Sequence, residues 1–241
     1  TDIKIIIDSG IKPIIVHGGG PQINNVLQKM NIKHKFYKGM RVTDKTTFIV
    51  VEMVLAGLIN KEISLNLSLK GVNSVGISGC DSKLIMAKKF LFDNKNNIDL
   101  GYVGMPYKLN SKFIKDLIKS NLVPIIAPIG FSANGEKYNI NADITAGFIA
   151  HKMNARRLLM LTDVKGVIDK KEKLIPELKL KEIKKLISDN VIYGGMIPKV
   201  NTCIEAVKKG VRASVILDGR VKHALLKELF SAKGIGTLFR K

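Results

Sequence analysis

The chain has 241 residues with a formal net charge of +20, and 46% of its residues are hydrophobic. This length and apolar content suffice for a large buried core, in one domain or two closely packed lobes. No apolar run approaches the ~20 residues of a membrane-spanning helix, and no signal peptide is recognisable. Cys80 and Cys203 are too few for a disulfide framework and wrongly spaced for zinc. These features predict a soluble protein of a reducing compartment, without a membrane partner.

The positive charge does not indicate a nucleic-acid partner. Only six of the 40 basic residues are arginine, and the lysines are spread singly or in pairs along the chain. Nucleic-acid recognition favours clustered arginines and aromatic platforms, and this chain has no tryptophan. We expect solvated lysine-rich surfaces that draw anionic substrates toward a cleft.

The N-terminal part combines a helix with a strand that ends in glycines. A helical pattern over residues 2–9 leads through Gly10 to an apolar run at 14–16. In an α/β unit a strand normally precedes the first helix, and none is found here. We therefore expect the chain to be truncated at its N-terminus. His17, three glycines and Pro21 follow the apolar run, which predicts a buried strand, a tight turn and a helix with proline in its first turn.

The glycine loop, Gly18 to Gly20, predicts an oxyanion site, because a ligand can lie against backbone N–H groups at the positive end of a helix. The chain has no P-loop, G-x-x-x-x-G-K-[S/T], and only half of the dinucleotide pattern G-x-G-x-x-G. An α/β-hydrolase is an alternative, since His-Gly-Gly-Gly loops occur there and residues 76–80 resemble G-x-S-x-G. Cys80 replaces the last glycine of that motif, which weakens this alternative.

Helix and strand patterns alternate along the rest of the chain. A long, largely apolar helix is expected over residues 47–69. Residues 84–109 are typical of paired strands with an Asn/Asp-rich turn at 93–97. Ser111 is expected to cap a helix that runs to Lys119. Other helices are predicted at 142–153, 180–189, 198–209 and 224–230, and strands at 75–78, 123–129, 158–161, 213–217 and 236–239.

Strands rich in Ile, Val and Leu that alternate with helices predict an α/β fold: a mostly parallel open sheet with helices on both faces, in a three-layer sandwich. Ligands of such sheets bind beyond the carboxyl ends of the strands. Polar segments are expected there at 18–20, 139–143, 162–167 and 194–199. Each alone could be a cap or a turn. Together, with Lys199 in the first turn of a helix, they indicate a phosphoryl-transfer cleft.

Six motifs are spread along essentially the whole chain: His-Gly-Gly-Gly-Pro (17–21), Gly-Met-Arg-Val-Thr-Asp (39–44), Tyr-Asn-Ile-Asn-Ala-Asp (138–143), Leu-Thr-Asp-Val-Lys-Gly (161–166), Gly-Gly-Met-Ile-Pro-Lys-Val (194–200) and Gly-Ile-Gly-Thr (234–237). Together they resemble the acetylglutamate kinases of the amino acid kinase family. The resemblance implies the amino acid kinase fold, with an acetylglutamate-binding and dimerisation lobe at 1–154, whose first strand is missing, and an ATP-binding lobe at 155–241. It implies transfer of the ATP γ-phosphate to the side-chain carboxylate of N-acetyl-L-glutamate, giving N-acetyl-L-glutamyl 5-phosphate in arginine biosynthesis.

The resemblance also implies roles for single residues at the acceptor end. Gly19 and Gly20 would face the acetylglutamate and the phosphoryl group in transfer. Arg41 would hold the α-carboxylate of the substrate, aided by Asn139.

At the nucleotide end, Lys199 would stabilise the transferring phosphoryl group and Asp143 would orient it. The family has a second lysine on a first strand, which would precede this chain. The residues that would border the nucleotide are Thr162, Asp163, Val164, Gly166, Gly195, Met196 and Lys199.

The expected chemistry needs positive charge rather than a general base, because a carboxylate acceptor is already ionised at neutral pH. Two anions must be brought together, so positive groups, backbone N–H groups and Mg²⁺ carried by ATP should do the work. We expect no metal site in the protein itself, no catalytic His or Cys, and a structural role for His17.

Residues 223–237 resemble the signature of the arginine-inhibited, hexameric branch of these kinases. This implies feedback inhibition by L-arginine near His223, Glu228 and Gly234, and a homodimer that forms a hexamer in the full-length protein. With the Lys- and Asn-rich composition, a cytoplasmic or plastid-stroma location is expected, and plastid relatives can bind a PII-type regulator.

Three alternatives stay open beside this interpretation. The chain could be another enzyme of the same fold, acting on carbamate, aspartate or a nucleotide. It could be a non-catalytic module that senses arginine, and the α/β-hydrolase esterase is less favoured. Only Arg41 with Asn139 specifies the acceptor, and that assignment depends on the resemblance.

Overall fold

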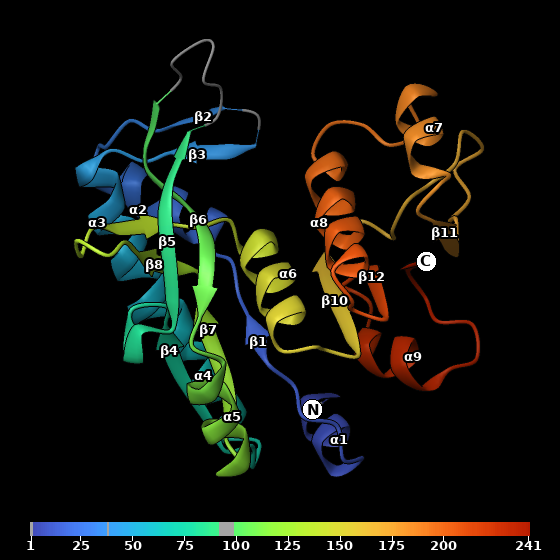
Figure 1. Cartoon of the computed structure of the whole chain (residues 1–241), viewed down its shortest axis with the longest axis horizontal. Helices are drawn as coiled ribbons and strands as arrows, with labels where there is room; N and C mark the ends of the chain where they lie inside the picture. The colour runs from blue at the N-terminus through green and yellow to red at the C-terminus, as the bar shows by residue number, and fades with distance from the viewer. Residues whose placement is uncertain (1, 38, 92–98) are drawn as a thin grey trace. The chain divides into compact units, whose positions relative to one another are not determined.

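The structure is a computed structural model that describes residues 2–37, 39–91 and 99–241 (Figure 1). It divides into two compact units. Unit 1 comprises Ile7–Thr145, and unit 2 comprises Asp2–Ile6 and Ala146–Lys241. The boundary falls within helix α6 (Ala142–Lys152), whereas the sequence led us to expect it after residue 154. Each unit has a hydrophobic core of its own.

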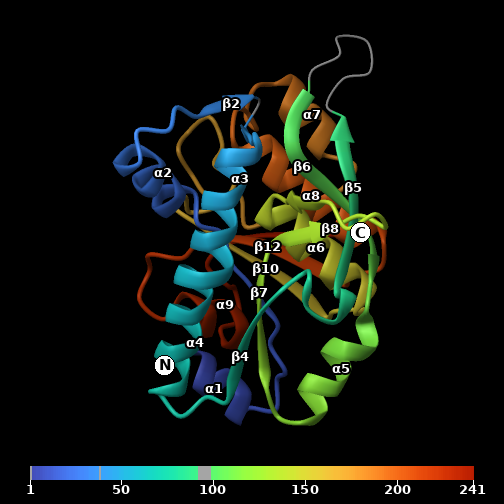
Figure 2. The same ribbon diagram turned by 90° about the vertical axis from the view of Figure 1, so that its left-hand side faces the viewer.

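A parallel sheet of three strands forms the centre of unit 1. Its strands are, in order, β1 (Ile15–Val16), β7 (Val123–Ala127) and β4 (Ser74–Ser78). Every residue of β7 is buried, as in strands that are covered on both faces. The covering helices are α4 (Asn60–Ser68) and α5 (Ser111–Lys119), which flank β7 on opposite sides in Figure 2.

The long helix expected over residues 47–69 is confirmed as one continuous helical segment. It consists of α3 (Lys45–Glu52), a π-helical segment η1 (Met53–Ile59) and α4. Asp44 caps its start, since its Oδ1 accepts the N–H of Thr47 at 2.7 Å. The apolar face of α3 and η1 packs with α2 (Gly20–Lys29) in the core of unit 1.

The cap predicted for α5 was wrong by one residue. The N-cap is Asn110, whose Oδ1 accepts the N–H of Phe113 at 3.3 Å, and Ser111 is the first helical residue. Asparagine and serine are comparably good N-caps, so the sequence alone does not separate two neighbouring candidates. The helix itself ends at Lys119 as expected.

The paired strands predicted over 84–109 are confirmed, while the turn at 93–97 lies outside the described residues. The strand predicted over 123–129 is wrong in its end, because Pro128 separates two strands that belong to different sheets. The confirmed pair is β5 (Ile85–Leu91) and β6 (Asp99–Leu109), which are antiparallel and form a closed barrel with β8 (Ile129–Phe131) and β9 (Lys137–Asn139). Strands of only three residues were not predicted: β9, and the antiparallel pair β2 (Lys35–Tyr37) and β3 (Met40–Val42).

Unit 2 contains a mixed four-stranded sheet with a helix on each face. On one face, Ile216 shares a core with Val200 and Cys203 of helix α8 (Met196–Lys208). On the other face, Val215 and Leu217 pack with helix α9 (Ala224–Phe230). The sheet is therefore covered on both sides, and the α/β fold with helix, sheet and helix layers is confirmed. In sheet order the strands are β10 (Arg157–Thr162), β12 (Ala213–Asp218), β13 (Thr237–Arg240) and β11 (Glu177–Lys179).

The remaining described helices are short. No helix in the described ranges is both long and apolar enough to cross a lipid bilayer. The short helices are α1 (Asp2–Asp8), η2 (Asp81–Lys83) and α7 (Ile183–Ser188).

Candidate active site

The glycine loop lies between β1 and α2, as the sequence predicted, and all three glycines line a cavity of unit 1. A Cβ on Gly19 would lie 2.4 Å from Ile59 Cδ1 and 2.8 Å from Leu55 Cδ2, so a side chain here would force these two buried side chains of the long helix to move. A Cβ on Gly20 would meet nothing within 4 Å. Gly19 therefore lets the loop pack close to the helix, and Gly20 leaves open space for a ligand at the start of α2.

The cavity has a volume of about 210 Å³. Its walls are mostly apolar, with a few polar groups, which is typical of a site for a small molecule. Arg41 and Asn139, the two residues expected to bind the acceptor, both line it together with the glycine loop. Other lining side chains are Phe36, Met40, Leu55, Phe90, Met105 and Asn141.

Arg41, on β3, is only 7% exposed. Its Nη2 donates to Asn24 Oδ1 at 2.6 Å and to the carbonyl of Gly20 at 3.3 Å. Among the described residues, its buried Nη1 has no hydrogen-bond partner and no carboxylate forms an ion pair with the guanidinium. Burial lowers the pKa of Arg41, because the charged form loses water. A buried, uncompensated cation favours an anionic ligand in the cavity.

Asn139 and Asn141 differ in their contacts. Asn139 Nδ2 donates to Thr43 Oγ1 at 3.3 Å, and this hydroxyl donates to the carbonyl of Arg41 at 2.9 Å. Asn139 is therefore linked to the strand that carries Arg41. Asn141 Oδ1 accepts the N–H of Ile144 at 3.1 Å, so it caps α6. Asp143, in the first turn of α6, lies between two lining residues but is not itself one of the described lining residues.

His17 is held in a buried network whose other member, Asn60, was not predicted. Its Nδ1 lies 3.0 Å from the carbonyl of Gly18, and its Nε2 accepts from Asn60 Nδ2 at 3.1 Å. Burial lowers the pKa of His17, against a smaller opposite effect of the Gly18 carbonyl. Asn60 also donates to the carbonyls of Ile77 and Ile125, on two strands of the sheet. The only signal for Asn60 in the sequence is an amide inside an apolar helix.

The serine motif at 76–80 does not form a catalytic triad. Ser78 Oγ donates to Asp81 Oδ2 at 3.1 Å and accepts the N–H of Cys80 at 3.3 Å. In the part of the chain that the structure describes, no histidine bonds to Ser78, which a serine nucleophile needs as its base. Burial raises the pKa of Cys80, so this thiol is not activated either.

The residues expected to border the nucleotide lie in two regions of unit 2: the end of β10 with the loop after it, and the loop before α8 with the first turn of that helix. Thr162, the last residue of β10, donates from its Oγ1 to Asp163 Oδ1 at 3.1 Å, and Val164 follows. Gly166 has a φ of +138°, and a Cβ there would lie 2.6 Å from Thr237 Oγ1. The second loop leads into α8: Gly194 has a positive φ and Gly195 is the N-cap. Met196 and Lys199 follow in the first turn of that helix.

Asp218 and Arg220 form a charged pair beside the first of these loops, and the sequence analysis missed it. Asp218 is paired in register with Thr162 at the ends of parallel strands. Its carboxylate accepts from Arg220 Nε at 2.9 Å and from Nη2 at 2.8 Å. The hydrogen bonds from Arg220 lower the pKa of Asp218 to about 2. The Asp-Gly-Arg run after a predicted buried strand was the available signal.

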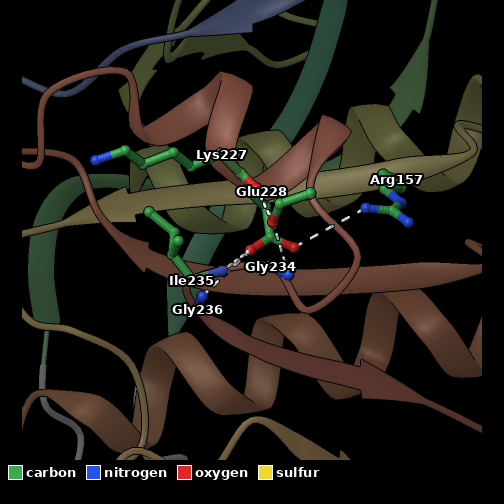
Figure 3. A network of polar contacts seen from close by, with 7 residues as sticks. Arg157, Lys227, Glu228, Gly234, Ile235 and Gly236 are labelled. Carbon is green, nitrogen blue, oxygen red and sulfur yellow. Dashed lines mark hydrogen bonds and ion pairs between the residues drawn. The ribbon is translucent and has the colours of Figure 1, made fainter.

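The residues expected to bind an effector are only partly brought together (Figure 3). Glu228 is 6% exposed, and its Oε2 accepts the N–H groups of Ile235 at 2.8 Å and Gly236 at 3.2 Å. Arg157 Nη1 lies 3.9 Å from its Oε1. A Cβ on Gly234 would lie 2.6 Å from Glu228 Oε2, so only glycine fits beside this carboxylate.

His223 is engaged elsewhere. Its Nδ1 lies 2.7 Å from Asp2 Oδ1, and the structure records no hydrogen bond between His223 and Glu228. Its backbone has a left-handed conformation with a φ of 60°, at the N-cap of α9.

No metal site was found: within residues 2–37, 39–91 and 99–241, no group of three or more His, Cys, Asp or Glu side chains could hold an ion.

Known proteins match this chain in sequence and in fold. The model of the amino acid kinase family matches residues 1–218. The chain is 49% identical over 247 residues to an acetylglutamate kinase of Methylobacterium nodulans and 51% identical over 247 residues to one of Parvibaculum lavamentivorans. Both matches cover 100% of this chain and 81% of the relative. N-acetylglutamate synthase from Neisseria gonorrhoeae, solved with coenzyme A and N-acetyl-glutamate, matches with a TM-score of 0.88 at 23% identity over 100% of this chain and 54% of that one, which shows the fold alone. The chain therefore belongs to the amino acid kinase family and, within it, to the acetylglutamate kinases.

Proposed function

We propose that the chain transfers the γ-phosphate of ATP to the side-chain carboxylate of N-acetyl-L-glutamate, giving N-acetyl-L-glutamyl 5-phosphate in arginine biosynthesis. Acetylglutamate kinases that match the whole chain at about half identity support this reaction. In the structure, the supporting observation is Arg41: a buried guanidinium that no carboxylate of the described residues pairs with, in a cavity shared with the glycine loop. Such a group suits the α-carboxylate of the acceptor, which it can bind through charge-assisted hydrogen bonds.

The reaction joins two anions and transfers no proton. An oxygen of the acceptor carboxylate bonds to the γ-phosphorus, and the bond from this phosphorus to the bridging oxygen of ADP breaks. Since the acceptor is ionised at neutral pH, no general base is required. Catalysis then depends on holding the reactants in line and on stabilising charge. Mg²⁺ enters with ATP as part of the substrate and neutralises charge on the β- and γ-phosphates.

Each unit supplies part of the proposed machinery. In unit 1, the backbone N–H groups of Gly19 and Gly20 stabilise the phosphoryl group in transfer, and Arg41 and Asn139 hold the acceptor. In unit 2, Lys199 stabilises the phosphoryl group through its ammonium. Asp143, in the first turn of α6, belongs to unit 1, and its orienting role rests on the resemblance. The nucleotide is bound by the loops after β10 and before α8, at Thr162, Asp163, Val164, Gly166, Gly195 and Met196.

An acceptor screen tests this proposal against other kinases of the same fold. ATP turnover is measured with N-acetyl-L-glutamate, L-glutamate, L-aspartate and carbamate at equal concentrations. We expect turnover with acetylglutamate to exceed that with each other acceptor at least tenfold. Preferential turnover of carbamate or aspartate would contradict the proposed acceptor, and binding of arginine without any turnover would favour a sensing module.

We also propose that free L-arginine inhibits the enzyme at Glu228. The sequence of residues 223–237 supports this, as does a buried carboxylate that already has a guanidinium, that of Arg157, within 3.9 Å. In Glu228→Gln, the amide oxygen can still accept from Ile235 and Gly236 but carries no charge. We therefore expect weaker inhibition with unchanged activity in the absence of arginine, measured by titrating L-arginine into both proteins. Identical inhibition curves would contradict the site.

The proposed assembly is a homodimer, three of which could form a hexamer. The support is an apolar strip along the outside of the long helix, whose members are each half exposed or more: Ile49, Met53, Leu58, Leu65 and Leu69. A second copy would cover such a strip. The proposed hexamer depends on the resemblance of residues 223–237 alone, and the proposed PII-type regulator depends on the ability of plastid relatives to bind one. We propose a cytoplasmic location, because both relatives named above come from bacteria and lend no support to a plastid.

A further inference from the structure

Asn24, on α2, is the side chain that holds Arg41 in place. We infer that Asn24 is a positioning residue for acceptor binding: its neutral amide oxygen fixes the guanidinium of Arg41 without cancelling its charge. This inference rests on the proposed function, in which Arg41 binds the α-carboxylate. It extends the acceptor site to a residue that does not itself line the cavity among the described residues.

The contact geometry leaves one arrangement of the amide. Arg41 Nη2 lies 2.6 Å from Asn24 Oδ1, which is short for a hydrogen bond and typical of a charged donor. Because a guanidinium has donors and no acceptor, the amide must present its oxygen rather than its nitrogen. The same Nη2 reaches the carbonyl of Gly20 at 3.3 Å, so one edge of the guanidinium is tied to the start of α2.

Phe36, on β2, supplies a second constraint. The Cζ of Arg41 lies 4.6 Å from the centre of the Phe36 ring, within the range of a cation–π contact. The ring fixes the face of the guanidinium, while Asn24 fixes one edge. Nη1 is then the nitrogen that has no hydrogen-bond partner among the described residues, and a ligand carboxylate in the cavity would supply one.

The neutral charge of Asn24 matters as much as its position. A carboxylate at this place would accept the same hydrogen bond, but it would neutralise Arg41 in a buried setting and compete with the carboxylate of the acceptor. An amide avoids that competition. Asn24→Asp therefore separates charge from position, since it keeps the acceptor oxygen and the shape of the side chain. Asn24→Ala removes both.

The test measures kcat/KM for acetylglutamate from initial-rate slopes at saturating ATP, together with the KM for ATP. We expect kcat/KM to fall at least tenfold in Asn24→Asp and several-fold in Asn24→Ala, with the KM for ATP within twofold of the wild-type value. Asn25→Asp is the matched control, because it adds the same charge to the exposed neighbour on the same helix. It should leave both quantities within twofold. Thermal unfolding of all variants monitors folding.

A double-mutant cycle distinguishes positioning from a general structural effect. If Asn24 acts through Arg41, Asn24→Ala should cost several-fold in the wild-type background and less than twofold in Arg41→Ala. Equal losses in both backgrounds would overturn the inference, as would an Asn24→Asp protein with wild-type kcat/KM. Those outcomes leave the proposed function intact. A wild-type chain that does not phosphorylate acetylglutamate would instead overturn the proposed function and this inference with it.

Discussion

Arg41 serves the proposed acceptor site through the shape of its guanidinium as well as through its charge. Its Nη2 is tied to Asn24 and Gly20, and its Nη1, which no described residue pairs with, is left for a ligand. Arg41→Lys keeps the charge, but a single ammonium cannot maintain both contacts in a fixed plane. We expect the KM for acetylglutamate to rise at least tenfold and the KM for ATP to stay nearly unchanged in steady-state kinetics. Equal effects on both substrates would count against the assignment.

Asp218 should make the stability of the fold depend on pH in acid. The side chain of Arg220, followed by its backbone N–H, lowers the pKa of Asp218 from 3.8 to about 2. Because the folded-state value is the lower one, the carboxylate stabilises the fold above about pH 4, and this contribution is lost as the pH falls through about 2. Asp218→Asn should therefore lower the melting temperature near neutral pH, and the difference from wild type should narrow in acid. Thermal unfolding of both proteins across this pH range measures the difference between their melting temperatures. A difference that is the same at every pH would contradict the prediction.

The residues that the sequence predicted well are those with distinctive chemistry in a distinctive place. Gly19, Gly20, Arg41 and Asn139 were expected to meet, and they line one cavity. The amides that support them were not predicted: Asn24 is 17 positions from Arg41, and Asn60 is 43 positions from His17. An asparagine carries no charge and fits a helix surface, a cap or a buried network equally well. Only the tertiary contacts reveal which of these it is.

At the level of elements, Gly76 allows β4 to lie close to the long helix. A Cβ on Gly76 would lie 2.1 Å from Asn60 Oδ1, whereas a Cβ on Gly57, in η1, would meet nothing within 4 Å. We expect Gly76→Ala to lower the free energy of unfolding by about 1–3 kcal/mol through overpacking. Gly57→Ala should raise it by up to about 1 kcal/mol through helix propensity. Urea denaturation of both variants measures this, and effects of the same sign would contradict the packing argument.

Helices and strands with a long apolar pattern were predicted better than short ones. The helix over 45–68 and the strand Ala213–Asp218 have long apolar patterns and were predicted to within a few residues. Strands of three residues, such as Lys35–Tyr37 and Met40–Val42, contain too few positions for a periodicity, so the hairpin that carries Arg41 was missed. The π-helical segment was missed as well, because its apolar residues continue the pattern of the flanking helices. The motif at 39–44 therefore identified Arg41 as a candidate site residue, but the strand that carries it was not predicted.

On the scale of the whole molecule, the residues proposed for the two substrates fall in different units. The glycine loop, Arg41, Asn139 and Asp143 belong to unit 1, and the loops after β10 and before α8 belong to unit 2. The fold class could be predicted because buried parallel strands appear as continuous apolar runs, and these runs alternate with helical patterns along the chain. The boundary between the units could not be located, because it falls inside one regular helix, α6, where composition and pattern do not change.

Because the two proposed roles fall to different residues, we predict that replacing Lys199 lowers kcat without weakening the binding of acetylglutamate. Its ammonium is proposed to act on the phosphoryl group in the transition state, while Arg41, in the other unit, holds the acceptor. Removing one such charge from a dry cleft typically costs ~10²–10³ in rate. Lys199→Ala should therefore lower kcat at least ~100-fold and leave the affinity for acetylglutamate, measured by calorimetry, close to that of the wild type. Lys208→Ala, in the last turn of the same helix, is the control and should change neither quantity. Should Lys199→Ala weaken acetylglutamate binding while kcat holds, Lys199 would have to be reassigned to substrate binding.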